Sequence, residues 1–439
     1  MTSTVIQNDV YAELVNKYPT SEALLAWLSS TEGGSLAVHD SRRLPDDPVV
    51  LISYTDKSDK TLPHVPYFRS VIWNLRANRP VCASPVASSA SESFTSSTFV
   101  AEEFVDGVML NMFWDEKRAA WRIASRSQMD APNTYYSRRP FYELFSEAVA
   151  ANSLDLGELS REYTYSWVLQ HPAERVVTLT PYGIPRIRLV EMARFLENGT
   201  QLITRDPHSF LPSKFRALLP ESHEVLTVQD VFDRIAAWGH RFGTQWKGLV
   251  IKDTKTAKQW SFQSEQYKVA RELRGTSAKL PFVWLERWAD QKLNQYLKLY
   301  PEEMHEASKV VDSFKACTQE AFDLYHQVYR AKAFPLREAP QKYRKLLWEL
   351  HQARAGAYFP TLRDFMNKQD TARKLWLVNY EVRYPNSPVP AALNADAVRD
   401  AQEANGLAAV AAEDAALEAE QHSALEMEAS DVQQEAVEV

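Results

Sequence analysis

The chain has 439 residues, 45% of them hydrophobic, which allows two or three domains with a sizeable core. Its two cysteines, Cys82 and Cys317, exclude a disulfide scaffold and provide no paired-cysteine motif for structural zinc. The net charge of −7 is unevenly distributed: residues 391–439 hold twelve acidic residues and one arginine, so the preceding 390 residues carry a net charge of +4.

The first nine residues show neither the basic segment nor the apolar segment of a secretory signal peptide. No run of about 18 apolar residues suits a membrane span. Together with the low cysteine content, these features predict an intracellular protein of the cytoplasm or nucleus. We expect no secretion and no membrane contact.

Residues 1–60 are predicted to form a small αβ lead-in. Residues 21–28 repeat apolar side chains at helical spacing behind a Thr20 or Ser21 cap, and residues 48–54 are typical of a strand. Residues 65–82 predict two strands around a short turn, with Arg69 at a strand end. The serine-rich residues 83–98 are typical of a loop.

Residues 98–128 contain two apolar, β-rich runs on either side of a charged turn at 115–118, which predicts a hairpin. Asp106 and Gly107 stand where one strand meets the next, and a glycine there lets a backbone or ligand approach closely. This layout resembles motif I of the covalent nucleotidyltransferases (RNA ligases, DNA ligases and mRNA capping enzymes), which is Lys-x-Asp-Gly followed by a strand. In this chain Phe104 takes the place of the nucleophilic lysine.

Three more segments resemble elements of the phage-type RNA ligases. Arg69 corresponds to an arginine that faces the nucleotide in those ligases; a surface arginine at a strand end is the alternative and the favoured interpretation. Arg126 lies in a Ser-Arg-Ser sequence that can hold phosphate oxygens. Residues 163–177 resemble motif III: a strand, Pro172 and a second strand at 175–177, including Arg175, with Val168 in place of the ribose-binding glutamate. His171 is either a general base or a turn histidine, and the second is expected because no partner carboxylate is in view.

The later motifs show the same kind of substitution. Residues 245–253 match motif IV, except that Lys247 replaces the glutamate that handles the metal, which removes a hard-cation ligand. Lys252 is retained. Residues 260–275 resemble motif V, with Ser261 and Gln263 in place of two lysines that contact the α-phosphate. A helix at 231–238 is predicted to end at Gly239.

From residue 280 onward, apolar side chains at helical spacing predict helices at about 302–332, 340–356 and 360–380. The predicted fold is α+β: a nucleotidyltransferase domain of ATP-grasp-like antiparallel sheets at 61–279, an all-helical domain at 280–386 and an acidic Ala/Glu-rich tail at 387–439, expected to be disordered. The basic side chains of the helical domain form either a solvated surface, the favoured interpretation, or an RNA-binding face. They are Lys342, Arg344, Lys345, Arg354, Arg363 and Lys368.

The covalent mechanism of the family needs a lysine nucleophile, cations on the phosphate and carboxylates for a metal. Because five such positions are changed, the resemblance implies a catalytically degenerate protein of the kind found in large DNA viruses, which a virus particle could package. It would bind a nucleotide or RNA, or would be a structural component, with protein partners at the helical domain or the tail. The expected binding residues are Arg69, Asp106, Gly107, Arg126, Arg175, Lys252 and Arg271.

The alternative is an active RNA ligase or adenylyltransferase that uses a substitute lysine, Lys247 or Lys252. Only this alternative requires ATP and Mg²⁺; otherwise no cofactor and no metal is expected. The sequence leaves the two hypotheses open, and we favour the degenerate one because losing a covalent nucleophile typically costs several orders of magnitude in rate.

Overall fold

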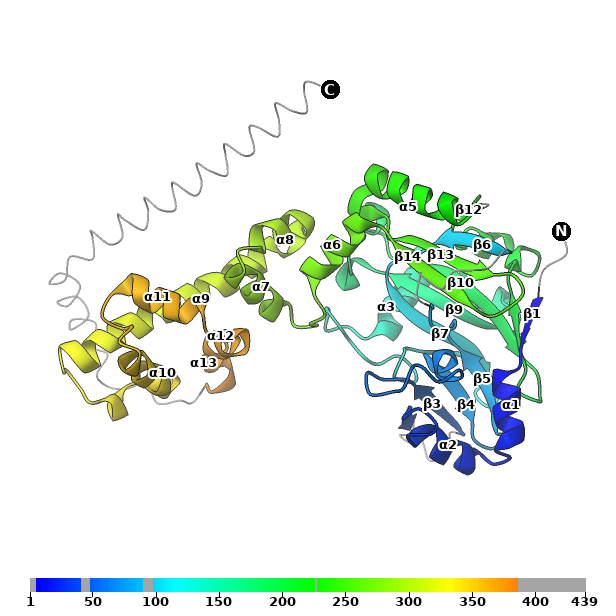
Figure 1. Cartoon of the computed structure of the whole chain (residues 1–439), viewed down its shortest axis with the longest axis horizontal. Coiled ribbons are helices and arrows are strands. Elements are labelled where there is room, and N and C mark those ends of the chain that lie inside the picture. Colours follow the sequence, from blue (N-terminus) through cyan, green and yellow to red (C-terminus); the bar gives the residue numbers. More distant parts are fainter. Residues whose placement is uncertain (1–4, 41–47, 90–97, 226, 386–439) are drawn as a thin grey trace, which may run out of the picture. The chain divides into compact units, whose positions relative to one another are not determined.

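The computed structural model describes residues 5–40, 48–89, 98–225 and 227–385, and the chain divides into two units, Met1–Val283 and Trp284–Val439. The predicted acidic tail and most of the serine-rich loop lie outside the described residues. Within the described part of the chain, the first unit holds three antiparallel sheets and the second unit holds helices. This confirms the predicted α+β order of antiparallel sheets followed by a helical region (Figure 1).

The largest sheet has six strands in the order β1-β11-β10-β9-β7-β8. Their bounds are Val5–Asn8, Gln201–Thr204, Arg186–Phe195, Thr164–Gln170, Val108–Asp115 and Ala120–Ala124. Strands β7 and β8 form the predicted hairpin, and β7 also pairs with β9. Helix α3 (Phe141–Ala151) packs Leu144 and Phe145 against Trp167 and Leu189 on one face of this sheet, which leaves the other face for the pocket described below.

The second sheet, in the order β2-β3-β4-β5, comprises Ala37–Asp40, Val49–Ser53, Val71–Asn74 and Arg79–Ala83. Helices α1 (Val10–Lys17) and α2 (Ser21–Ser29) pack on it, and the Thr20 side chain caps α2 as predicted. Residues 65–68 were expected to begin a strand, but they form the 3-10 helix η1 (Val65–Phe68). The predicted pair of strands is β4 and β5, which follow it.

The third sheet has the order β12-β6-β13-β14, with bounds Ser222–His223, Phe99–Glu103, Gly248–Asp253 and Gln259–Gln263. Helix α5 (Val228–Phe242) covers one face through Val231, Ile235 and Trp238. The prediction that this helix ends at Gly239 was wrong, because the helix continues to Phe242 and ends at Gly243 with a φ of +55°. Helix α6 (Glu265–Arg274) follows β14.

The remaining helices of the first unit are short: η3 (Leu156–Glu158), η4 (Pro172–Glu174), η5 (Pro181–Gly183), η6 (Pro207–Ser209), α4 (Ser213–Arg216) and η7 (Gly243–Gln245). No strand forms at residues 175–177, where motif III predicted one. Strand β1, within the predicted lead-in of residues 1–60, pairs with β11 of the large sheet. The domain boundaries given above stay predictions.

Helices α7 to α13 form the rest of the described chain. Their bounds are Leu280–Ala289, Leu293–Leu299, Met304–Tyr325, Gln341–Gln352, Phe359–Asn367, Thr371–Val378 and Tyr380–Arg383, with η8 (Pro301–Glu303), η9 (His326–Arg330) and η10 (Leu336–Glu338) between them. The helix predicted at 360–380 is therefore two helices, the second capped by Asp370. Lys342, predicted on a basic surface, is buried and pairs with Glu320 and Glu381.

Candidate functional site

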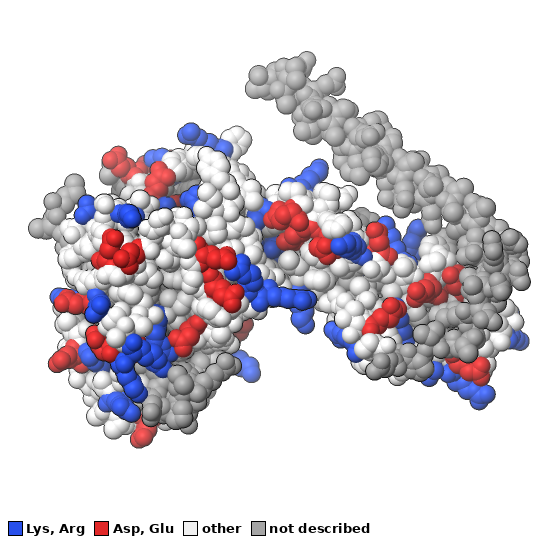
Figure 2. All heavy atoms as spheres, turned by 180° about the vertical axis from the view of Figure 1, so that it is seen from behind, with Lys and Arg blue, Asp and Glu red and all other residues white. Residues whose placement is uncertain are grey.

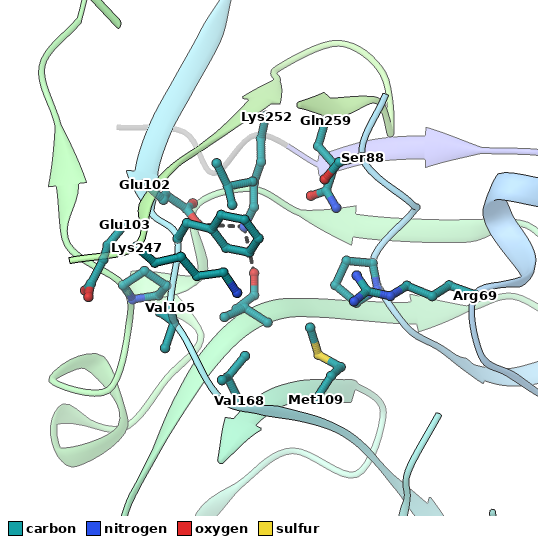
Figure 3. A pocket seen from close by; sticks show the side chains of 16 residues that line it. Arg69, Ser88, Glu102, Glu103, Val105, Met109, Val168, Lys247, Lys252 and Gln259 are labelled. Carbon is teal, nitrogen blue, oxygen red and sulfur yellow. Dashed lines mark hydrogen bonds and ion pairs between the residues drawn. The ribbon is translucent and has the colours of Figure 1, made fainter. Parts of the chain in front are cut away.

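A pocket of about 140 Å³ lies in the first unit, where strands of the large sheet face strands β6 and β13 of the third sheet. Met109, Val168 and Val190 contribute from the large sheet, and Lys252 and Lys247 from β13 and the residue before it. Arg69 extends into the pocket from the side opposite Lys247 (Figure 3). The motifs that resemble motifs I, III and IV of the ligases therefore meet at one place.

Gly107 sets the geometry of the pocket at the start of β7. Its φ is +145°, and a Cβ at this position would lie 2.2 Å from the Leu169 carbonyl oxygen of β9 and 2.9 Å from Val168 Cγ1. The backbone of the Asp-Gly sequence therefore touches the neighbouring strand directly, which only glycine permits. This close approach fixes the direction of the Asp106 side chain just before it.

Asp106 is a buried carboxylate that accepts hydrogen bonds on both oxygens. Its Oδ2 accepts from the backbone N–H groups of Val177 and Thr178 at 3.0 and 3.1 Å, and its Oδ1 accepts from the Tyr267 hydroxyl at 2.6 Å. Burial alone would raise the pKa of this carboxyl, but the Lys247 ammonium and the hydrogen bonds outweigh it, so the pKa is lowered. Asp106 is therefore an anion that ties three segments of the chain together.

Lys247 places its ammonium inside the pocket, 3.5 Å from Asp106 Oδ1 and 3.8 Å from the centre of the Phe104 ring. Burial lowers the pKa of Lys247, Asp106 raises it, and Arg69 and Arg271 lower it further, with a lowered pKa as the result. Phe104, the residue in the nucleophile position, lines the pocket and contacts this ammonium through a cation–π interaction. The Phe104 ring and the Lys247 amine therefore lie together where the resemblance to motif I predicts the amine of a single lysine.

Lys252 lines the pocket, and two partners hold its side chain. Its Nζ donates to Glu102 Oε2 and to the Val190 carbonyl oxygen, each at 2.6 Å. Strand β10 has an irregular register between Leu189 and Glu191, and this bulge presents the Val190 carbonyl to the lysine. Because both contacts are short and buried, Lys252 is a structural cation and is poorly placed to act as a nucleophile.

Arg69 differs from the other pocket cations. Within the described part of the chain, its guanidinium has neither a hydrogen bond nor an ion pair. Burial lowers the pKa of Arg69, Tyr54 raises it and the nearby Arg126 lowers it. Arg126 is exposed, stacks on the Tyr54 ring at 4.9 Å and donates to the Tyr54 carbonyl. A positive charge in the pocket therefore lacks a described counter-ion.

The other predicted site residues lie in four different places. Val168 lines the pocket, whereas Ser261 and Gln263 line a separate groove beside α5. Arg175 is buried and donates from Nε to the Val177 carbonyl at 3.0 Å, so it shapes the loop that binds Asp106. Arg271 lies on α6 and donates to the Gly275 carbonyl.

His171 has a partner that the sequence did not reveal. Its Nε2 lies 3.0 Å from a Glu147 carboxylate oxygen, and its Nδ1 accepts from the backbone N–H of Ala173 at 3.1 Å. The expectation that no carboxylate lies nearby was therefore wrong. The histidine nevertheless caps the 3-10 helix η4, which fits the predicted turn role.

The carboxylates of the pocket are all occupied by cations of the chain. Glu102 pairs with Lys252, Glu103 with Arg188 at 3.4 Å, and Asp106 with Lys247. Within the described residues, no group of three or more His, Cys, Asp or Glu side chains is placed to hold a metal ion. Coordination of a divalent cation by these carboxylates would compete with their ion pairs.

Glu102 and Tyr267 are site residues that the motif comparison missed. Glu102 lies two residues before Phe104 on β6, where strand alternation places both on one face. That alternation was the available signal for Glu102. Tyr267 was noted only as a motif landmark, and nothing local indicates its bond to Asp106, 161 residues away.

The surface carries charges of both signs. On the face shown in Figure 2, Lys and Arg side chains are interspersed with Asp and Glu side chains. Among the helices that the structure describes, none is long and apolar enough to cross a membrane. A nucleic-acid contact on this face would therefore rest on particular side chains, because the face shows no broad basic surface.

Comparisons with known proteins give structural neighbours only. No family model matches the chain, and no curated protein matches it. Form 1 of an archaeal ATP-dependent RNA ligase matches with 12% identity and a TM-score of 0.34, covering 69% of this chain and 78% of its own. Form 2 of that ligase matches with 11% identity and a TM-score of 0.37, covering 70% of this chain and 82% of its own. A putative ATP-dependent DNA ligase from Aquifex aeolicus matches with 11% identity and a TM-score of 0.40, covering 68% of this chain and 80% of its own. These values do not assign the chain to a family.

Proposed function

We propose that this chain is an RNA-ligase-like protein of the nucleotidyltransferase fold whose pocket holds a phosphate group of a nucleotide or nucleic acid without covalent transfer. The observation that carries this proposal is the Arg69 guanidinium, which enters the pocket without a counter-ion among the described residues. A charge withdrawn from water without a partner is costly, so an anionic ligand would stabilise this arrangement. Lys247, on the opposite side, adds a second cation.

The size of the pocket supports a phosphate as the bound group. Small-molecule pockets usually measure about 300–1,000 Å³, whereas this cavity measures about 140 Å³. The Phe104 ring and the Lys247 side chain occupy part of the pocket wall where the family would need room for its nucleotide. A phosphate can enter from the mouth while the rest of the ligand stays outside.

The residues present support the proposed absence of covalent transfer. Phe104 has no nucleophilic atom, Val168 cannot bond a ribose hydroxyl, and the carboxylates are paired with cations. Phosphoryl and nucleotidyl transfer depend on cations or a metal that neutralise the developing charge. The proposed role of the pocket is therefore to bind a phosphate group, and not to carry out the covalent transfer reaction of the ligases.

The test is calorimetric binding of AMP, ATP and adenosine to the full chain. We expect AMP and ATP to bind and adenosine to bind far more weakly. An Arg69→Gln variant should lose about 10-fold to 150-fold in AMP affinity, because a charge-assisted hydrogen bond contributes about 1.5–3 kcal/mol. The exposed Arg76, which follows β4, supplies the control variant Arg76→Gln, with unchanged affinity expected. Equal affinities for AMP and adenosine would overturn the proposal.

A second candidate is a nucleotidyltransferase that uses Lys247 as its nucleophile. It is favoured by one observation: the Lys247 amine lies in the pocket beside Phe104 and burial lowers its pKa, which increases the neutral fraction that can attack. In this reaction Nζ would attack the α-phosphorus of ATP, a P–N bond would form, the P–O bond to pyrophosphate would break, and the amine would release a proton.

Incubation with α-labelled ATP and Mg²⁺ or Mn²⁺ separates the two candidates. Non-covalent binding predicts no label on the denatured protein. Label that is present in the wild type, absent in Lys247→Met and retained in the exposed control Lys268→Met would establish the second candidate and refute the first.

A further inference from the structure

An exposed apolar loop stands beside the pocket and has no role in the function proposed above. It runs from Val177 to residue 185, between η4 and β10. Leu179 is 53% exposed, Ile184 49% and Tyr182 97%. Apolar side chains that are this exposed are costly to keep in water, and three of them within six residues make a surface rather than a scattered set.

The base of the loop is bound to the pocket itself. Val177 and Thr178 donate their backbone N–H groups to Asp106, and Leu179 donates its backbone N–H to the Gln245 side chain at 2.8 Å. At the other end, the Asn152 side chain donates to the Pro185 carbonyl at 2.9 Å. The loop therefore has fixed ends, and its first end is joined to the carboxylate that pairs with the pocket residue Lys247.

The tip holds Tyr182 in an unfavourable backbone conformation. Its φ is +56° and its ψ is 15°, in the left-handed region, and Gly183 follows with a φ of +67°. A residue other than glycine pays about 1–2 kcal/mol for this conformation. The side chain gains no packing in return, since 97% of its surface is exposed. Such strain without local compensation indicates a role in binding.

Two arginines follow the loop on the pocket-facing side of the large sheet. Arg186 and Arg188 lie two residues apart on β10 and therefore share one face. Their cross-strand partners are Gln170 and Val168, and Val168 lines the pocket. Arg188 pairs with Glu103, whereas Arg186 has no hydrogen bond or ion pair within the described residues. Partial burial and the neighbouring Arg188 lower the pKa of Arg186.

We infer that the loop and these two arginines form a binding surface for single-stranded nucleic acid, continuous with the phosphate pocket. Arg186 and Arg188 would contact successive phosphates, and the Tyr182 ring would stack on an unpaired base. A single strand is the ligand of this chemistry, because a paired base has both faces covered by its neighbours, whereas an exposed aromatic ring needs a free face. This inference rests on the proposed function, because it assumes that the phosphate group in the pocket belongs to a nucleic acid.

The test is fluorescence anisotropy of the full chain with labelled 12-nucleotide RNA and DNA single strands and with the matching duplexes. We expect single strands to bind more tightly than duplexes. Tyr182→Ala should weaken single-strand binding about 5-fold to 150-fold, the loss of about 1–3 kcal/mol of stacking, while Tyr182→Phe should keep the affinity. Tyr358, 72% exposed in the other unit, supplies the control variant Tyr358→Ala, with no effect expected.

Arg186→Gln tests the phosphate contact separately. It should weaken all single strands alike and reduce the slope of log affinity against log salt by about 0.7, the value for one phosphate of a single strand. Because Tyr182 is fully exposed, its variants should fold normally, and circular dichroism verifies this. Equal affinity for duplex and single strand, or unchanged binding by Tyr182→Ala, would overturn the inference.

The two proposals fail in different ways. AMP binding that depends on Arg69, without any binding of oligonucleotides, would refute the single-strand surface and leave the phosphate pocket intact. Oligonucleotide binding that depends on Tyr182 but is insensitive to Arg69→Gln, together with no AMP binding, would refute the pocket and support the surface.

Discussion

Replacing Asp106 by asparagine removes the charge that the pocket is built around. The carboxylate accepts from two backbone N–H groups on one oxygen and from the Tyr267 hydroxyl on the other, and it lies 3.5 Å from the Lys247 ammonium. An amide has only one accepting oxygen, so its NH₂ group must face donors on one side. We expect Asp106→Asn to be strongly destabilising because it leaves a buried cation unpaired.

The magnitude follows from these contacts. Removing one partner of a buried ion pair costs about 3–5 kcal/mol. We expect the lower end, about 3 kcal/mol, because the Lys247 side chain is 14% exposed and its amine can release its proton. A loss of about 3 kcal/mol in a unit of this size lowers the melting temperature by about 6–12 °C. Tyr267→Phe removes only one donor to a charged group and should cost about 1.5 kcal/mol.

Urea unfolding of the full chain, followed by circular dichroism, measures these losses. The control is Asp233→Asn on the exposed surface of α5, which makes the same change of charge and should stay within about 0.5 kcal/mol of the wild type. A loss below about 1 kcal/mol for Asp106→Asn would refute the view that this carboxylate holds the pocket together.

The pH dependence gives an independent check. The folded-state pKa of Asp106 is lowered, so its stabilisation is fully present above the unfolded-state pKa, near about 3.9, and is lost as the pH falls through the folded-state value. The difference in unfolding free energy between wild type and Asp106→Asn should therefore be large at pH 7 and shrink below pH ~4. A difference that stays constant down to pH ~2 would contradict the lowered pKa.

Two further substitutions test the frame of the pocket. Gly107→Ala should cost about 3 kcal/mol or more, because the new Cβ would lie 2.2 Å from the Leu169 carbonyl oxygen. The control Gly183→Ala, also at positive φ but with open space around it, should cost about 1 kcal/mol. Similar losses of unfolding free energy in urea for the two variants would argue against the steric cause. Lys252→Met should cost about 1.5–3 kcal/mol, because it leaves the half-buried Glu102 carboxylate without its partner. The double variant with Glu102→Leu should recover part of this loss, so a double variant no more stable than Lys252→Met would rule out the ion pair as the cause.

The sequence predicted the local part of this fold well. The β7–β8 hairpin, helix α2 and strand β3 were visible because each follows from apolar periodicity within about ten residues. The motif comparison also brought Asp106 and Lys247 to one pocket, 141 positions apart in the sequence, although as separate motif positions and not as an ion pair.

What the sequence could not provide are contacts made by neighbours in space. Glu102 meets Lys252 across 150 residues, and the backbone N–H of Thr178 meets Asp106 across 72. Neither contact leaves a periodic pattern. Ser261 corresponds to one of the phosphate-binding lysine positions, yet it lines a separate groove beside α5.

Two glycines, at the starts of strands β7 and β13, share one backbone feature. Gly107 and Gly248 both have φ angles near +146°, at +145° and +147°, and at each a Cβ would collide with a carbonyl of the adjacent strand. The Phe104 N–H donates to the Gly248 carbonyl at 2.9 Å and so joins the starts of the two strands. The backbone course at these two glycines is therefore set by main-chain contacts, and the Phe104 side chain makes none of them. A different side chain at position 104 could change what the pocket recognises while these contacts stay the same.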